Sequence, residues 1–196
     1  MTATDATAAT TAPTIPGYRA GTWVVDPSHS EVGFSVRHLM VSKVRGRFAS
    51  FEGTFVTAEN PLDSTVEASI DVSSVDTNNA DRDAHLRSAD FFDVEQYPDF
   101  TYRSTGIRVD DGDLVVDGEL TLHGLTKPVP LALEVHGFLP ESPFGDHRVG
   151  LSATGELSRK EFGITFDAPL EGGGVGLSDR IHITLEIEAV LQGDDA

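Results

Sequence analysis

Apolar and polar residues alternate along most of this chain with the two-residue period of a β-strand. An early segment shows the pattern well: Val32, Phe34 and Val36 fall on one face of an extended strand, while Ser35 and Arg37 fall on the other face or at its margin. Water strongly disfavours that much apolar surface on one face. We therefore expect the chain to form a sheet that buries a shared interior.

The same alternation recurs in later segments, and short stretches rich in Gly, Pro, Asn or Asp separate them. Sequential strands joined in this way pair antiparallel, and closing them into a barrel removes exposed edges. The pattern predicts an all-β fold, an eight-stranded antiparallel β-barrel with one short helix. Strands are expected at 22–26, 30–39, 44–56, 65–72, 99–109, 113–122, 129–135, 148–158 and 181–191.

Two local signals refine this picture. Gly46 and Gly53 predict a bulge or a sharp bend inside the strand at 44–56. The period changes at 79–92, NADRDAHLRSADFF, where amide and acidic residues precede good helix formers. This segment is the best helix candidate, and we expect one or two helical turns in it, with Leu86 and the Phe91–Phe92 pair facing inward.

Length and composition set the class of protein. The chain has 196 residues, enough for one domain with a substantial core. Residues 1–17 are small and polar, which predicts a disordered N-terminal leader, and residues 18–196 are expected to form the barrel domain. The absence of cysteine excludes disulfides and thiolate metal sites.

Charge narrows the range of partners. The formal net charge is −18, and it argues against nucleic acid and anionic lipid surfaces as partners. No segment has the roughly 20 apolar residues that a membrane span needs. The N-terminus also lacks the basic start and apolar run of a secretory signal, so we expect a cytoplasmic protein.

The barrel interior can be filled by its own side chains or can hold a ligand. The chain has 11 Phe but only 3 Tyr and 1 Trp, which favours an apolar wall over polar recognition. An apolar wall with few polar groups is typical of a ligand cavity, but it is also typical of a packed core. The pattern leaves both interpretations open.

The densest charge cluster is DRDAHLR at 81–87, and three roles remain open for it. It can be a solvated helix face with local ion pairs, or a polar rim at the barrel mouth where Arg82 or Arg87 meets a phosphate headgroup. It can also form a metal site or an acid–base site from Asp81, Asp83 and His85. No nucleophile elbow, HExxH motif or phosphate loop supports an enzyme.

Three separated runs resemble the YceI-like family of polyisoprenoid-binding proteins. They are DPSHSEVGFSVRHLMVSKVRGRF, RDAHLRSADFFDVEQYPDFTY and DGELTLHGLTKPVPL, and they occur in the family's order. The resemblance implies a lipocalin-like barrel with an elongated apolar tunnel that takes up an isoprenoid or another long-chain amphiphile without covalent chemistry. It also implies a homodimer. Many relatives are exported, but this sequence carries no export signal, so we expect a cytoplasmic carrier, buffer or stress-response binding protein.

The resemblance and the alternation together name the expected site. No catalytic residue, metal or cofactor is expected apart from a bound isoprenoid or other lipid. The headgroup candidates are His38, Arg82, His85 and Arg87. The expected apolar lining residues are Phe34, Val36, Phe48, Phe51, Ile70, Leu86, Phe91, Phe92, Phe100, Leu120, Leu122, Leu133 and Phe162.

Overall fold

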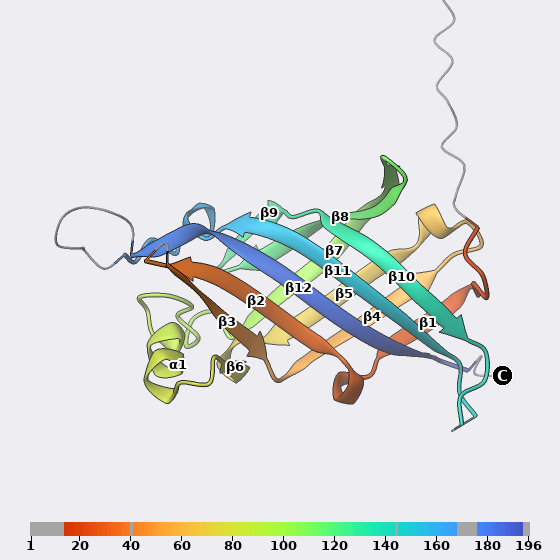
Figure 1. Ribbon diagram of the computed structural model, residues 1–196, viewed down its shortest axis with the longest axis horizontal. Helices are drawn as coiled ribbons and strands as arrows, with labels where there is room; N and C mark the ends of the chain where they lie inside the picture. The colour runs from red at the N-terminus through yellow and green to blue at the C-terminus, as the bar shows by residue number, and fades with distance from the viewer. Residues whose placement is uncertain (1–13, 40, 144, 168–175, 194–196) are drawn as a thin grey trace, which may run out of the picture.

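The computed structural model describes residues 14–39, 41–143, 145–167 and 176–193 (Figure 1). Its elements are strands, one α-helix and single turns of 3-10 helix. The strands are β1 (Gly21–Val25), β2 (Glu31–His38), β3 (Ser42–Phe48), β4 (Phe51–Thr57), β5 (Thr65–Asp71), β6 (Val75–Asp76), β7 (Asp99–Asp110), β8 (Asp113–Leu122), β9 (Leu125–Pro128), β10 (Leu131–Leu139), β11 (Arg148–Ser158) and β12 (Leu177–Leu191). The helices are η1 (Pro27–His29), η2 (Pro61–Asp63), η3 (Val72–Ser74), α1 (Ala80–Arg87) and η4 (Lys160–Phe162).

The sheet closes on itself, which confirms the predicted eight-stranded antiparallel barrel. The closed path runs β1-β4-β5-β7-β8-β10-β11-β12, and β12 pairs again with β1. Every pairing along it is antiparallel, and β9 adds a short hairpin to β8. Figure 1 shows these strands wrapping obliquely around one long axis. Within the described residues, no helix is long and apolar enough to cross a membrane.

Closure depends on β12, the longest strand with 15 residues. One of its edges pairs with β11 over its whole shared length, from Arg148 to Ser158. The other edge is shared, because its first part pairs with β2 and its last residues, Ala189–Leu191, pair with β1. The chain thus crosses from β1 to β2 through η1 while staying beside the same strand.

The predicted strand at 44–56 is two strands, and the break lies at Ala49–Ser50 rather than at Gly46 or Gly53. The amide of Ala49 donates to the carbonyl of Ser74 (3.1 Å), and the amide of Asp71 donates to the carbonyl of Ser50 (3.0 Å). This corner therefore bonds to the matching corner at η3, which separates β5 from β6. Turning both strands together lets β3 pair with β6 beside α1.

The helix α1 has eight residues and lies within the predicted segment 79–92, as the expected one or two turns require. The Asn79 side chain accepts a hydrogen bond from the amide of Arg82 and caps the N-terminus, as sequence rules lead one to expect. The helix ends at Arg87, and the chain then turns back so that the amide of Phe92 donates to the carbonyl of Leu86 (3.0 Å). Leu86, Phe91 and Phe92 nevertheless pack against the core, as predicted.

Gly46 has a steric role that the sequence analysis did not identify. It lies opposite Phe34 on β2, and a Cβ atom at Gly46 would lie 2.4 Å from Cζ of Phe34 and 2.8 Å from Cγ2 of Thr77. The Phe34 ring itself packs at 5.6 Å from the Phe48 ring. The missing side chain of Gly46 therefore provides the space that the Phe34 ring fills.

We predict that Gly46→Ala lowers the free energy of unfolding by about 1–3 kcal/mol, because overpacking forces the neighbouring ring to move. Urea denaturation measures the change. The matched control is Gly106→Ala, since a Cβ atom at Gly106 would meet nothing within 4 Å. Equal unfolding midpoints for the two variants would contradict the steric role of Gly46.

Candidate functional site

A cavity of about 330 Å³ lies inside the barrel. Each strand of the closed path contributes at least one residue to its wall, from Val25 on β1 to Leu185 on β12. The volume falls within the range of about 300–1,000 Å³ that is common for small-molecule sites. Because strand side chains alternate, the apolar positions of each strand face this space together.

The structure places the predicted apolar residues on the cavity wall, with one exception. Their contact with a ligand stays a prediction. The predicted residues that line the cavity are Phe34, Val36, Phe48, Phe51, Ile70, Leu86, Phe91, Phe92, Phe100, Leu120, Leu122 and Leu133.

Phe162 is the exception, because it is not among the residues that line the cavity. It lies in the 3-10 turn η4, is 1 % exposed and packs within the core cluster. The turn ends at Gly163, whose φ of 78° lies in the left-handed region. This turn, rather than a strand, sets the direction of the Phe162 side chain, so alternation could not place it.

Tyr102 is a polar residue of the wall that the sequence analysis missed. Its hydroxyl is shared between the carbonyls of Val116 (3.2 Å) and Val129 (3.1 Å). The ring passes over Gly118, where a Cβ atom would lie 2.3 Å from the phenol oxygen. Burial, together with the negative charge of Asp117, raises the pKa of Tyr102 to about 12. The phenol therefore stays neutral beside the apolar cavity.

Arg159 is a second polar wall residue that was missed, and it is only 2 % exposed. Its guanidinium donates to the carbonyls of Ser178, Ile164, Phe166 and Leu177 at 2.7–3.2 Å. These bonds tie the chain after η4 to the start of β12. Buried carbonyls need partners, and this one cation supplies several. No sequence pattern predicted this position on the wall, because Arg159 follows the end of β11 and alternation applies only within a strand.

Residues that precede the barrel strands also contribute to the cavity wall. Ile15 and Tyr18 line the cavity, so the described chain reaches the wall within the segment predicted as a leader. The Tyr18 hydroxyl donates to the carbonyl of Ala58 (2.7 Å), and its ring meets the Phe138 ring edge-on at 5.6 Å. The domain boundary between 17 and 18 stays a prediction.

The four headgroup candidates are not among the residues that line the cavity, and their contact with a ligand headgroup stays a prediction. The Arg82 guanidinium donates to the hydroxyl and the carbonyl of Thr77, both at 2.7 Å. The Arg87 guanidinium donates to the carbonyls of Ser73 and Val75, also at 2.7 Å. Both arginines therefore hold α1 against the chain that leads into it.

Neither histidine candidate lies on the cavity wall. His85 Nε2 lies 2.8 Å from Asp90 Oδ2, and its ring meets the Phe91 ring edge-on at 5.0 Å. His38 is exposed at the end of β2. Asp83 is buried and accepts hydrogen bonds from the amide and hydroxyl of Thr77 at 2.9 and 2.5 Å. The Asp81, Asp83 and His85 side chains thus do not converge on one metal or acid–base site.

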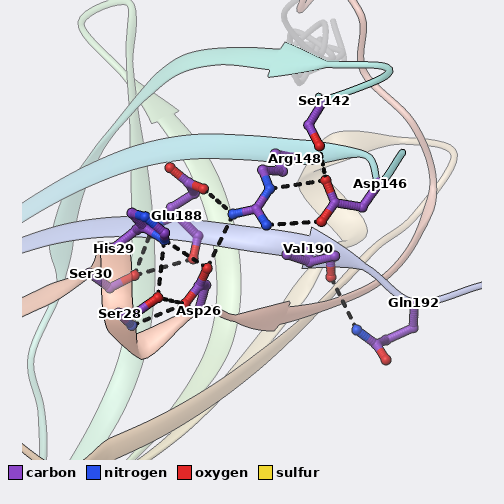
Figure 2. A network of polar contacts seen from close by, with 10 residues as sticks. All are labelled: Asp26, Ser28, His29, Ser30, Ser142, Asp146, Arg148, Glu188, Val190 and Gln192. Atoms are coloured by element: carbon purple, nitrogen blue, oxygen red, sulfur yellow. Dashed lines mark hydrogen bonds and ion pairs between the residues drawn. The ribbon is translucent and has the colours of Figure 1, made fainter. Parts of the chain in front are cut away.

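A different set of polar residues does converge, outside the cavity (Figure 2). Ligand atoms of Asp26, His29 and Glu188 lie within 4.8 Å of one another, the sole such trio among the described residues. However, Arg148 Nη1 donates to Asp26 Oδ2 (3.1 Å) and to the Glu188 carboxylate, and the same guanidinium bonds Asp146 with two nitrogens at 3.0 and 2.9 Å.

This network is an ion cluster that joins the end of β1 to β11 and β12. Hydrogen bonds from Ser28 and from His29, and then from Arg148, hold the pKa of Asp26 well below its usual range. A cation already pairs with the carboxylates, so the arrangement favours a structural role over metal binding. Figure 2 shows Arg148 lying between Asp146 on one side and the Asp26–Glu188 pair on the other.

Comparison with known proteins agrees with this geometry. The sequence profile of the YceI-like domain matches residues 23–189. Protein YceI of Escherichia coli is 39 % identical over 165 residues, which cover 84 % of this chain and 83 % of that protein. The structure of Burkholderia cenocepacia BcnA aligns with a TM-score of 0.70 at 18 % identity, covering 84 % of this chain and 98 % of BcnA.

A further solved structure is described as a polyisoprenoid binding domain from Saccharophagus degradans implicated in plant cell wall breakdown. It aligns with a TM-score of 0.65 at 16 % identity, covering 89 % of this chain and all of that domain. At these identities the two structural matches establish the shared fold of the barrel.

The raised pKa of Tyr102 predicts a pH dependence of stability. An unfolded tyrosine loses its proton near pH 10, whereas folded Tyr102 keeps it until about pH 12. Its contribution is therefore complete below pH 10, and the free energy of unfolding falls as the pH rises from 10 toward 12. We predict that Tyr102→Phe makes this fall shallower, as measured by urea denaturation at several pH values. An identical alkaline decline in both proteins would contradict the assignment.

Proposed function

The chain belongs to the YceI-like domain family, and on that premise we propose that it binds one long-chain apolar ligand of the polyisoprenoid class inside its barrel, without converting it chemically. The observation that carries this proposal is the cavity of about 330 Å³, whose wall is built from apolar side chains of every strand in the closed path. The description of the Saccharophagus degradans domain as polyisoprenoid binding supports the ligand class.

The wall explains how such a ligand would gain affinity. Each methylene group that leaves water contributes about 0.8 kcal/mol, and ordering a flexible chain offsets part of this gain. A wall with so few polar groups distinguishes ligands by length and width. Isoprenoid quinones, prenyl phosphates and fatty-acid-like amphiphiles are therefore the ligands to compare.

Two polar wall residues are engaged with the protein itself. The Tyr102 hydroxyl and the Arg159 guanidinium both donate to backbone carbonyls. They satisfy the barrel's own carbonyls, which leaves the apolar side chains to contact the ligand. The alternative of an enzyme depended on the cluster around Asp83 and His85. In the structure Asp83 accepts a hydrogen bond from Thr77, and His85 is hydrogen-bonded to Asp90. Carriage of the ligand, a homodimer and a cytoplasmic location stay predictions.

We predict that narrowing the cavity weakens ligand binding while the barrel stays folded. Ala68 on β5 lines the cavity, so Ala68→Trp places an indole in the space that the ligand needs. We expect its affinity for a fluorescent polyene fatty acid, and for prenols that displace it, to fall about tenfold or more, which equals about 1.4 kcal/mol per factor of ten. Equilibrium fluorescence titration measures this loss.

The matched control is Ala132→Trp on β10. Ala132 is exposed on the outer face of the barrel and does not line the cavity. This variant makes the same chemical change and should bind the probe as the unmodified protein does. Loss of binding in both variants, or in neither, would count against a ligand inside the barrel.

A further inference from the structure

The hairpin formed by β2 and β3 has a charge opposite to that of the rest of the chain. Arg37, Lys43, Arg45 and Arg47 are four of the 14 Lys and Arg residues, and all four lie within this hairpin. None of the 32 Asp and Glu residues lies between residues 32 and 51. A chain with a net charge of −18 thus carries one concentrated basic segment.

These cations lie together on the outer face. Val36 and Phe34 line the cavity, so Arg37 on the same strand points outward by alternation. Arg37 stands directly opposite Lys43, and Ser35 stands opposite Arg45. All three basic side chains are exposed. Like charges directly opposite each other destabilise an antiparallel pair, so this arrangement costs stability unless an anion comes to it.

The carboxylates of the adjacent strands already have other partners. Asp76 on β6 pairs with Arg47 at 3.2 Å. Asp179 on β12 accepts hydrogen bonds from the Ser158 hydroxyl (2.8 Å) and the Lys160 amide (3.0 Å). Within the part of the chain that the structure describes, Arg37, Lys43 and Arg45 have no carboxylate within 4.0 Å.

The turn of the hairpin adds apolar side chains to the basic face. Val41 is 85 % exposed and Leu39 is 42 % exposed. Val41 is the most exposed of the large apolar side chains in the described residues. Leu39 has a φ of 51°, and its amide donates to the carbonyl of Gly176 (2.9 Å), so the turn is tied to the chain entering β12. The apolar side chains are thus held outward rather than folded back.

The hairpin projects at an end of the barrel that the cavity reaches. His38 pairs with Leu177 at the start of β12, and Leu177 lines the cavity. Figure 1 shows the turn between β2 and β3 at the same end of the barrel as α1. Leu86 of α1 is also part of the cavity wall.

We propose that the β2–β3 hairpin docks the protein on an anionic lipid bilayer, with Leu39 and Val41 entering the interface and Arg37, Lys43 and Arg45 meeting lipid phosphates. This proposal rests on the proposed function, because docking would bring the end of the cavity to the membrane where an apolar ligand resides. Basic residues beside inserted apolar side chains are the combination that binds anionic membrane surfaces.

The overall negative charge does not prevent this contact. At physiological ionic strength charges are screened over about 8 Å, so acidic groups that lie farther than this from the hairpin have little effect on it. They instead orient the molecule, since the basic hairpin is attracted while the acidic surface is repelled. A second copy of this acidic chain is the alternative occupant of the hairpin, and the oligomeric state tests it.

The test is flotation of the full-length protein with two kinds of vesicle. One contains phosphatidylcholine alone, and the other contains about one third phosphatidylserine. We expect binding to the anionic vesicles only. The double variant Lys43→Glu/Arg45→Glu and the variant Val41→Asp should each reduce that binding about tenfold or more, because each removes one of the two contributions.

Matched controls make the same changes elsewhere. Arg103→Glu/Arg108→Glu reverses two exposed arginines on β7, and Val56→Asp alters a valine that is 44 % exposed on β4. Both controls should float like the unmodified protein. Absence of flotation, or equal loss in hairpin and control variants, would overturn the proposal. The proposal would also be overturned if sedimentation showed a dimer that the hairpin variants abolish and if the protein did not bind vesicles.

The polyene fatty acid separates this proposal from the proposed function. Hairpin variants should bind the probe as the unmodified protein does, and Ala68→Trp should still float with anionic vesicles. If the protein binds the probe but does not float with vesicles, the membrane-docking proposal fails and the proposed ligand site stands. If the protein floats but does not bind the probe, the docking proposal stands and the proposed ligand site fails.

Discussion

Closure of the sheet through β12 is the constraint on which the structure depends. This strand bonds β11 along one edge and, in succession, β2 and β1 along the other. The bonded ring has eight strands, and a ring of that size has an interior wide enough for side chains or for one small ligand. The cavity is therefore a consequence of backbone pairing, and the side chains decide only how much of it remains empty.

The barrel satisfies its polar groups without filling that space. Tyr102 and Arg159 reach backbone carbonyls from the cavity wall. The corner at Ala49–Ser50 bonds to the corner at η3, and Arg148 forms ion pairs with carboxylates on the outside. In the described residues, no buried side-chain nitrogen or oxygen atom lacks a hydrogen-bond partner. An apolar interior can persist because the polar groups next to it have partners.

Local pattern predicted the fold well and the polar residues poorly. Two-residue alternation located β11 and placed Phe34, Ile70 and Leu133 on the cavity wall, because a strand's side-chain direction follows from its period. Alternation could not show that the strand at 44–56 turns at Ala49, since that corner is set by contacts with a distant segment. The YceI-like resemblance supplied the expectation of a tunnel, which the residues alone left open.

Long polar side chains are where sequence reasoning failed. Arg82 and Arg87 have the chemistry of headgroup ligands, but tertiary neighbours supply carbonyls within their reach. Arg159 had no recognisable pattern, yet it lies on the wall. The position of a guanidinium depends on several torsion angles and on partners from other elements. Neither quantity is encoded in spacing along the chain.

The central claim is that the interior of this barrel accommodates a foreign apolar chain. Electron density in crystals of the protein loaded with a long-chain prenol tests it most directly. The account predicts one continuous tube of density inside the barrel, in contact with Phe34, Ile70 and Leu133. A centre filled by the protein's own side chains, with the prenol absent or bound on the outside, would contradict it.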